Sequence, residues 1–283
     1  MNILFWSVLL VLIYFGLKKA YKNTKDIALN RLSIENEYTK EHSPKLSILH
    51  LSDLHLENIS ITPEELYTKL KDEHIDLIAL TGDFLDRKRT IPKLVPYLAV
   101  LNQLKAPYGM FAVLGNHDYV LRPDDLNTLI ETLENASCKV LINQHEPILI
   151  RGQLVNIIGI DDFSTSRSDL KSSYHGIQHG INLVLTHDPT IVLDMKHHHF
   201  DYLLAGHFHG GQICYPKAYH LAKMGKLARM NKIKGSHTQD GKKYYINEGL
   251  GQTAVNIRIG SRPEITIHEL SLASAQIESG KAI

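Results

Sequence analysis

The chain has 283 residues, and its 31 Lys and Arg nearly balance its 30 Asp and Glu, which gives a formal net charge of +1. This length can bury a sizeable core, and the near-zero charge excludes a global field for binding nucleic acid. Two cysteines, Cys138 and Cys214, are too few for a disulfide framework and are expected to be free thiols, whereas 17 histidines favour a metalloprotein.

The chain starts with an apolar stretch, residues 3–17, near the lower limit of roughly 17–25 residues for crossing a bilayer. No Lys or Arg precedes it and no small-residue cleavage site follows, which argues against a cleaved signal peptide. Four lysines follow instead: Lys18, Lys19, Lys22 and Lys25. The positive-inside rule then predicts a single-pass cell-membrane protein whose catalytic part is cytoplasmic. We expect an anchor at residues 1–20 and a polar linker at 21–44.

Strands and helices alternate in the next part of the chain. Short apolar runs predict strands at residues 47–51, 75–80 and 110–114. Thr62, Pro63 and Glu65 form a capping box with proline at the first helical position, so a helix starts there. Further helices are expected around residues 94–101 and after Pro123. This β-α-β-α-β-α order indicates a layered α/β domain.

Consecutive strands are expected in the second half. They are predicted at residues 139–142, 148–150, 154–160, 183–185, 202–205, 244–246, 254–257 and 264–270. The catalytic domain is therefore expected to span residues 45–271, and residues 272–283 are expected to be a frayed tail.

Five of the predicted strands are each followed by residues that can bind a metal. These residues are Asp53 and His55, Asp83, Asn116, His187, and His207 with His209. Open α/β sheets build their sites at the carboxyl ends of strands. We therefore expect these side chains to meet at one metal site.

The motifs around these residues resemble those of the calcineurin-like metallophosphoesterase superfamily. In order they are Asp53-x-His55, Gly82-Asp83, Gly115-Asn116-His117-Asp118, His187 and Gly206-His207-x-His209. The resemblance covers residues 45–270. Gly249-Leu250-Gly251 is similar to a motif of the bacterial membrane-associated phosphodiesterase-like branch of this superfamily. It implies an α/β fold, a four-layer α/β/β/α sandwich, here with an N-terminal membrane-anchor helix.

The resemblance also implies a site for two divalent metal ions that share a bridging hydroxide as the nucleophile. Carried over by position, one ion takes Asp53, His55, Asp83 and His209, and the other takes Asp83, Asn116, His187 and His207. Mixed nitrogen and oxygen ligands suit several metals. Manganese is the first expectation, and iron, zinc or magnesium are alternatives.

Three further residues receive roles from the resemblance. His117 resembles the family histidine that contacts the phosphoryl group and protonates the leaving oxygen. Asp86 lies where the family places the carboxylate that orients this imidazole. Arg87 either binds the substrate phosphate or supports its loop.

A basic segment at residues 217–234 interleaves apolar positions with its Lys and Arg residues. It is either an ordinary surface helix or an amphipathic patch that lies on anionic lipid.

The expected function is hydrolysis of a phosphoric ester, first of all a phosphodiester, at the membrane surface. The substrate is then a phosphate ester, lipid-linked or nucleotide-linked. The alternatives are a lipid pyrophosphatase of the UDP-2,3-diacylglucosamine type, a protein phosphatase, and a non-catalytic metal-binding scaffold.

Overall fold

The computed structural model describes residues 3–35 and 39–273, and its twelve strands form two six-stranded sheets. The first sheet has the order β1-β12-β2-β3-β4-β5. Its strands are β1 (Ala28–Ile34), β2 (Lys45–Leu51), β3 (Leu77–Thr81), β4 (Met110–Val113), β5 (Cys138–Val140) and β12 (Glu264–Ser271). The second sheet has the order β10-β11-β9-β8-β7-β6. Its strands are β6 (Gln144–Ile150), β7 (Gln153–Gly159), β8 (Ile181–Leu185), β9 (Tyr202–Ala205), β10 (Gly235–Gln239) and β11 (Lys242–Ile246).

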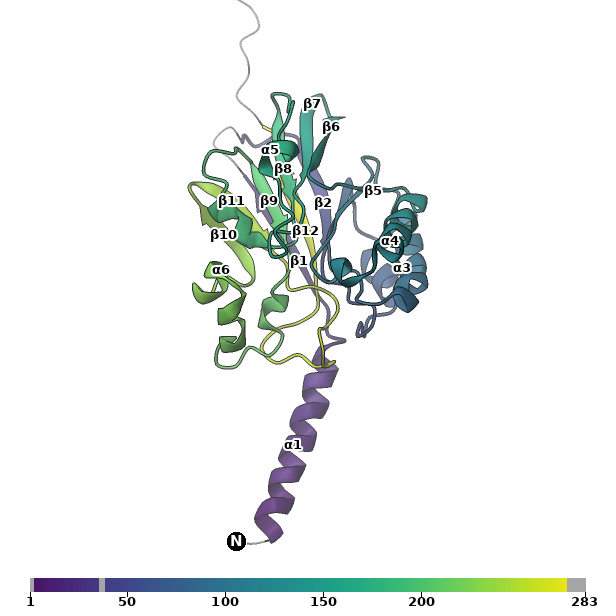
Figure 1. The fold of residues 1–283 in the computed structure, drawn as a ribbon, viewed down its shortest axis with the longest axis vertical. Coiled ribbons are helices and arrows are strands. Elements are labelled where there is room, and N and C mark those ends of the chain that lie inside the picture. Colours follow the sequence, from purple (N-terminus) through teal and green to yellow (C-terminus); the bar gives the residue numbers. More distant parts are fainter. Residues whose placement is uncertain (1–2, 36–38, 274–283) are drawn as a thin grey trace, which may run out of the picture.

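The two sheets pack face to face, with helices on both outer faces (Figure 1). Leu46 and Ile48 of β2 point between the sheets, whereas Leu49 and Leu51 point toward the outer helices of the first sheet. Strands buried on both faces read as continuous apolar runs because successive side chains enter different layers. The expected α/β/β/α sandwich is confirmed.

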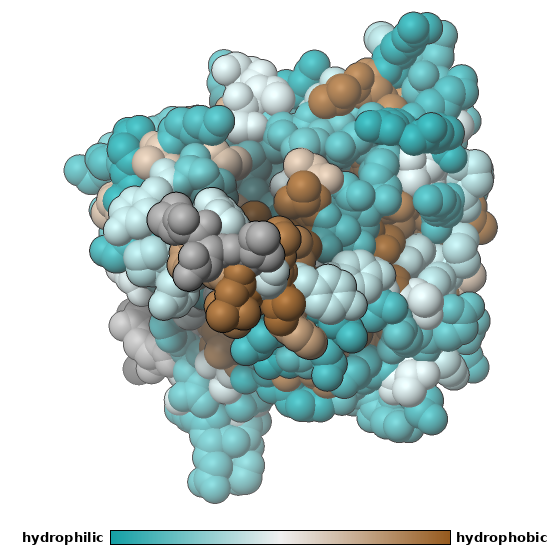
Figure 2. All heavy atoms as spheres, turned by 90° about the horizontal axis from the view of Figure 1, so that it is seen from below, coloured by the Kyte–Doolittle hydropathy of each residue, from teal (hydrophilic) through white to brown (hydrophobic). Residues whose placement is uncertain are grey.

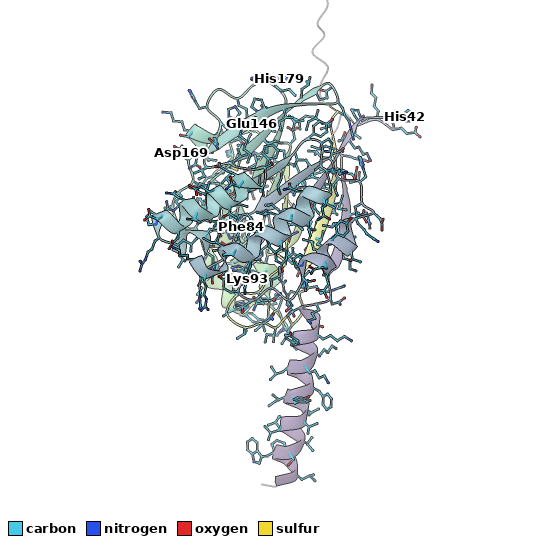
Figure 3. The ribbon with its side chains drawn as sticks, turned by 90° about the vertical axis from the view of Figure 1, so that its right-hand side faces the viewer. His42, Phe84, Lys93, Glu146, Asp169 and His179 are labelled. Carbon is cyan, nitrogen blue, oxygen red and sulfur yellow. The ribbon has the colours of Figure 1, made fainter. Side chains whose placement is uncertain are left out.

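The helices that cover the first sheet are α2 (Pro63–Leu70), α3 (Ile91–Gln103) and α4 (Pro123–Asn135). The predicted capping box of α2 is present, since Thr62 accepts the backbone N–H of Glu65 and Glu65 accepts that of Thr62. In Figure 3, the helices of this outer layer lie in front of Phe84, whose side chain is fully buried.

Short helical turns cover the second sheet. They are α5 (Leu170–Ser173), η3 (Pro189–Leu193), η5 (Tyr219–Met224) and α6 (Lys226–Arg229). Of the two alternatives for the basic segment at residues 217–234, the single surface helix is therefore wrong. Gly225, at φ 116°, separates η5 from α6, and Leu221 and Leu227 are buried beneath them.

The predicted linker at residues 21–44 is corrected over much of its length. Helix α1 runs from Ile3 to Asn23, and Ala28–Ile34 forms β1, which pairs in parallel with β12 over seven residues. β1 is an edge strand of the first sheet, and the backbone of β12, far away in the sequence, provides its hydrogen-bond partners. This polar stretch therefore folds as part of the sheet.

Three smaller expectations also change. Residues 254–257 form a loop instead of a strand, and Ala254 has a positive φ of 56°. β10 was not expected. Leu272, assigned to the tail, is buried and its N–H donates to the carbonyl of Pro44 at 2.8 Å, while residues 274–283 lie outside the described residues.

Helix α1 projects from one end of the domain, and its apolar side chains point outward along its length (Figure 3). Its residues Leu4–Asn23 are long and apolar enough to cross a membrane by length and composition. Viewed from that end, apolar atoms gather where α1 protrudes toward the viewer (Figure 2). β2 is antiparallel to β12, and β12 is parallel to β1, so β2, β3 and β4 all end at the α1 end of the domain.

Candidate metal centre

The residues that follow the strand ends converge at the α1 end of the sandwich. Asp53 and His55 follow β2, Asp83 follows β3 and Asn116 follows β4. From the second sheet, His187 follows β8, and His207 and His209 follow β9. The predicted ligand residues are thus brought together from both sheets.

One group of potential ligand atoms is formed by Asp53, His55 and His209, all of them buried. His209 Nε2 lies 3.3 Å from Asp53 Oδ1 and 3.1 Å from His55 Nε2. Ligand atoms at 2.0–2.2 Å from a common cation lie about 3 Å from one another. These separations therefore match a shared cation.

A second group is formed by Asp83, His187 and His207. His187 Nε2 lies 3.1 Å from Asp83 Oδ2 and 3.2 Å from His207 Nδ1. The other ring nitrogen of His187 donates to the carbonyl of Thr81 at 2.7 Å, which leaves Nε2 directed at the group.

The carboxylate of Asp83 connects the two groups. Its Oδ2 lies 3.1 Å from His187 Nε2 in one group and 3.4 Å from His55 Nε2 in the other. Its Oδ1 accepts the backbone N–H of His117 at 2.8 Å. The carboxylate of Asp83 therefore lies against side chains of both groups.

Asn116 provides the test of whether a metal fits. Its side chain lines the same pocket as Asp83, His207 and His209. Among the described residues, its Oδ1 is buried and has no hydrogen-bond partner. A buried amide oxygen without a partner costs free energy, and a cation beside Asp83 removes that cost. The donor set fits a divalent metal.

The backbone at the site is strained. Positive φ angles occur at Asp53 (49°), His55 (38°), Asp83 (54°), His207 (78°) and His209 (50°). Such conformations of residues other than glycine cost free energy and cluster at functional sites.

The carboxylate of Asp118 holds part of this strained backbone in place. It accepts the N–H groups of Asp83, Phe84 and Gly115 at 2.8–2.9 Å. Gly206 is required for a different reason, since a Cβ atom there would lie 1.9 Å from Ser52 Oγ. These contacts fix the backbone positions from which the proposed ligand side chains extend.

Charge within the centre is balanced by protons. Burial acts to lower the pKa of His55, but its hydrogen bonds with Asp83 and Asp86 outweigh burial and raise that pKa to about 10. Burial likewise opposes protonation of His187, yet Asp83 raises its pKa well above the usual range. Burial lowers the pKa of His209 to about 3. Divalent cations at this site therefore compete with the protons on His55 and His187.

His117 and Asp86 form a pair at the open side of the centre. His117 Nδ1 lies 2.9 Å from Asp86 Oδ1, and His55 Nδ1 lies 3.4 Å from the same oxygen. The His117 side chain is 32% exposed and lines the pocket, so a bound molecule can reach it. Arg87 is exposed, two positions beyond the buried Leu85.

Sequence reasoning missed one residue that supports the centre, Arg258. Its fully buried guanidinium donates to the backbone carbonyls of His209, Glu248, Gly249, Gly251 and Arg262. Burial lowers the pKa of Arg258 to about 10, which leaves it charged at neutral pH. It joins the His209 loop to the 248–251 loop, whose Leu250 and Gly251 donate to the backbone of Ser52 and Asp53.

Other histidines and acids lie outside the centre. His50 is buried in the core and pairs with Thr81 Oγ1. Asp161 accepts the hydroxyl of Tyr119 at 2.6 Å, and Asp188 caps the turn at Thr190. The run at residues 197–199 lies in an exposed turn.

Comparisons with known proteins agree with this geometry. The family model for calcineurin-like phosphoesterases matches residues 46–211. The uncharacterized metallophosphoesterase YkoQ of Bacillus subtilis is 59% identical over 95% of this chain and 99% of its own length. The UDP-2,3-diacylglucosamine pyrophosphatase LpxG of Chlamydia muridarum is 28% identical over 80% of this chain and 84% of its own. The phosphodiesterase YaeI of Escherichia coli is 26% identical over 82% and 85%, respectively.

Proposed function

The chain belongs to the calcineurin-like phosphoesterase family and is a metallophosphoesterase; from that premise we propose that it hydrolyses phosphodiesters with a dinuclear metal centre at the membrane surface. The observation that carries this proposal is the Asp83 carboxylate, which lies 3.1 Å from His187 and 3.4 Å from His55 and so belongs to both ligand groups.

The proposed ligands of the two metals follow the two groups. Asp53, His55 and His209 hold one ion, and Asn116, His187 and His207 hold the other, with Asp83 shared. When bound, two such ions lower the pKa of an attacking water and neutralise charge on the phosphoryl oxygens. The mixed imidazole and carboxylate donors suit manganese, iron and zinc better than magnesium, which prefers oxygen ligands.

His117 is the proposed general acid. It is partly exposed in the pocket, and its Nδ1 pairs with Asp86 Oδ1 at 2.9 Å, which orients the ring so that Nε2 can face a substrate. Burial opposes protonation, but the pairing with Asp86 and the nearby Asp83 raise the pKa of His117. An imidazole that keeps its proton near neutral pH is suited to donate it to a leaving oxygen. Arg87, which is exposed, stays a proposed substrate contact.

The membrane assignment rests on the position of the centre. The proposed ligands lie at the same end of the domain as α1, which is the proposed anchor within residues 1–20. Tyr215 and Tyr219 are 82% and 69% exposed next to Lys217 in the basic segment. Tyrosines favour the membrane interface and lysines attract anionic lipid. Lys18 and Lys19, directly after the apolar stretch, support a cytoplasmic catalytic domain.

A lipid-linked pyrophosphate is the second candidate substrate. The name of the LpxG relatives assigns them UDP-2,3-diacylglucosamine as a substrate, and a centre facing the bilayer suits a lipid-linked ester.

The test uses the full chain purified in detergent and loaded with Mn²⁺. We expect bis(4-nitrophenyl) phosphate to be cleaved faster than 4-nitrophenyl phosphate, with activity lost on chelation and restored by the metal. A preference for the monoester contradicts the diesterase proposal. Full metal occupancy without cleavage of either ester contradicts hydrolysis at this centre.

A further inference from the structure

A second chamber opens beside the metal pocket. The pocket that contains Asp83, Asn116 and His117 has a volume of about 190 Å³, and the neighbouring chamber has a volume of about 670 Å³. His207 and Met224 line both. A molecule whose phosphate lies in the smaller pocket therefore continues past these two side chains into the chamber, which has the size of a small-molecule site.

Hydroxyl groups dominate the polar lining of this chamber. Ser164, Ser166 and Ser168 come from the loop after β7, and Thr190 comes from η3. Phe163 adds an aromatic ring and Met224 an apolar side chain. The cation at the chamber is Lys223, which is exposed at the rim.

The unpaired hydroxyl of Thr190 is a second indication of a ligand site, separate from the shape of the chamber. The residue is 8% exposed, and among the residues that the structure describes its buried Oγ1 has no hydrogen-bond partner. Its backbone N–H is held at 2.8 Å by Asp188 Oδ1, and Asp188 also lines the chamber. A buried hydroxyl left without a partner lowers the stability of the folded chain. A ligand hydroxyl at this place removes that cost.

The lining discriminates between chemical classes of occupant. An acyl chain would leave the buried Thr190 hydroxyl without a partner and would lie against the Asp188 carboxylate, and both are unfavourable. A second strongly anionic group would lie against Asp188. A neutral ring that carries hydroxyls gives Thr190 a partner, faces the hydroxyls of the serine loop and packs on Phe163.

We propose that this chamber binds a hydroxyl-bearing ring, a sugar or the sugar of a nucleoside, that is attached to the reacting phosphate. This assignment rests on the proposed function, because it places the phosphate of the same molecule at the metal centre. It narrows the substrate class to nucleotide or sugar-phosphate esters.

The test compares two diesters with the same leaving group in the full-length protein with Mn²⁺. One is the 4-nitrophenyl ester of thymidine 5′-monophosphate, and the other is methyl 4-nitrophenyl phosphate, which cannot fill the chamber. Thr190→Val removes the hydroxyl and keeps the shape of the side chain. We expect the ratio of kcat/KM for the thymidine ester over the methyl ester to fall about tenfold, as for one lost hydrogen bond. Phe163→Leu, which keeps an apolar side chain without the ring, lowers the same ratio.

The control is Thr132→Val, on the outer surface of α4, where the hydroxyl donates to Thr128 within the same helix. This variant keeps the wild-type ratio. An unchanged ratio in both Thr190→Val and Phe163→Leu overturns the proposal for the chamber, while cleavage of the methyl ester leaves the proposed function standing.

A binding measurement separates the two proposals when neither ester is cleaved. Calorimetric titration of the metal-loaded protein with thymidine 5′-monophosphate then needs no turnover, and the difference between wild type and Thr190→Val isolates the contribution of the chamber. Binding that weakens about tenfold in Thr190→Val supports the chamber, and equal binding by both proteins contradicts it.

Discussion

The backbone nitrogen of Arg258 donates a hydrogen bond to the carbonyl oxygen of Ala20 at 3.0 Å. The side chain of Asn23 donates in return to the carbonyl of Arg258 at 2.9 Å. The guanidinium of the same arginine donates to the carbonyl of His209 at 3.3 Å. The end of helix α1 and a loop of the candidate metal centre are thus held by one buried residue.

Arg258→Lys is expected to weaken metal binding. An ammonium group offers three donors from one point and cannot reach the five carbonyls that the planar guanidinium satisfies, so the His209 and 248–251 loops lose their common support. Support residues of this kind are worth about 10–100-fold in metal affinity. Titration calorimetry with Mn²⁺ measures this loss. Arg89→Lys, at an exposed position, is the control, and equal affinity in both variants contradicts the role assigned to Arg258.

Truncation separates the anchor from the folded domain. A chain that begins at Lys19 keeps Ala20, Asn23 and β1, and we expect it to be soluble and as stable as the full chain. A chain that begins at Lys45 loses the buried side chains of Ile27 and Ile34. Each is worth about 1.5–3 kcal/mol, so its free energy of unfolding falls by about 3–6 kcal/mol. Denaturant unfolding of the two chains tests this, and equal stability restores the linker interpretation of residues 21–44.

The proximity of the proposed ligand side chains can be predicted from the sequence because the reasoning needs only local patterns. Each ligand follows an apolar strand, and parallel strands place their carboxyl ends at one edge, so Asp53, Asp83 and Asn116 are expected to meet without any knowledge of the loops. The same reasoning extends to His187 and His207 at the ends of β8 and β9.

What the sequence does not predict depends on contacts between distant segments. β1 is polar and weakly alternating, and its partner β12 lies more than 200 residues later, at Glu264–Ser271. Nothing in the neighbourhood of Arg258 distinguishes it from a surface arginine, because its five acceptors are backbone carbonyls. Residues 254–257 are apolar enough for a strand, but the positive φ of Ala254 turns the chain instead.

Metal binding is expected to release protons. Without metal, the raised pKa values of His55, at about 10, and of His187 keep both imidazoles charged at pH 7.5. A metal ligand must be deprotonated, so each histidine gives up one proton and the apparent affinity for Mn²⁺ rises as pH increases toward 10. Calorimetry in buffers with different ionisation enthalpies measures the number released. A binding enthalpy that is independent of the buffer contradicts this.

His117→Asn is expected to keep both metals but to slow the chemical step. General acid catalysis contributes about 10²–10⁴-fold, and the loss is smallest for 4-nitrophenyl esters because their leaving group needs little protonation. The measurement compares kcat for a 4-nitrophenyl and a simple alkyl leaving group. An equal loss for both leaving groups shows that His117 is not the acid. Asp86→Asn acts through the same imidazole, so it lowers kcat in the wild-type background but has little further effect on kcat when it is combined with His117→Asn.

The sharpest measurement is the metal content of purified wild-type protein and of Asp83→Asn, by mass spectrometry, together with turnover of bis(4-nitrophenyl) phosphate. Because the Asp83 carboxylate lies against both ligand groups, we predict two metals per wild-type chain and loss of both in the variant, with affinity reduced more than about 100-fold and activity abolished. A variant that retains two metals and near-wild-type turnover would show that the two groups do not form one dinuclear centre.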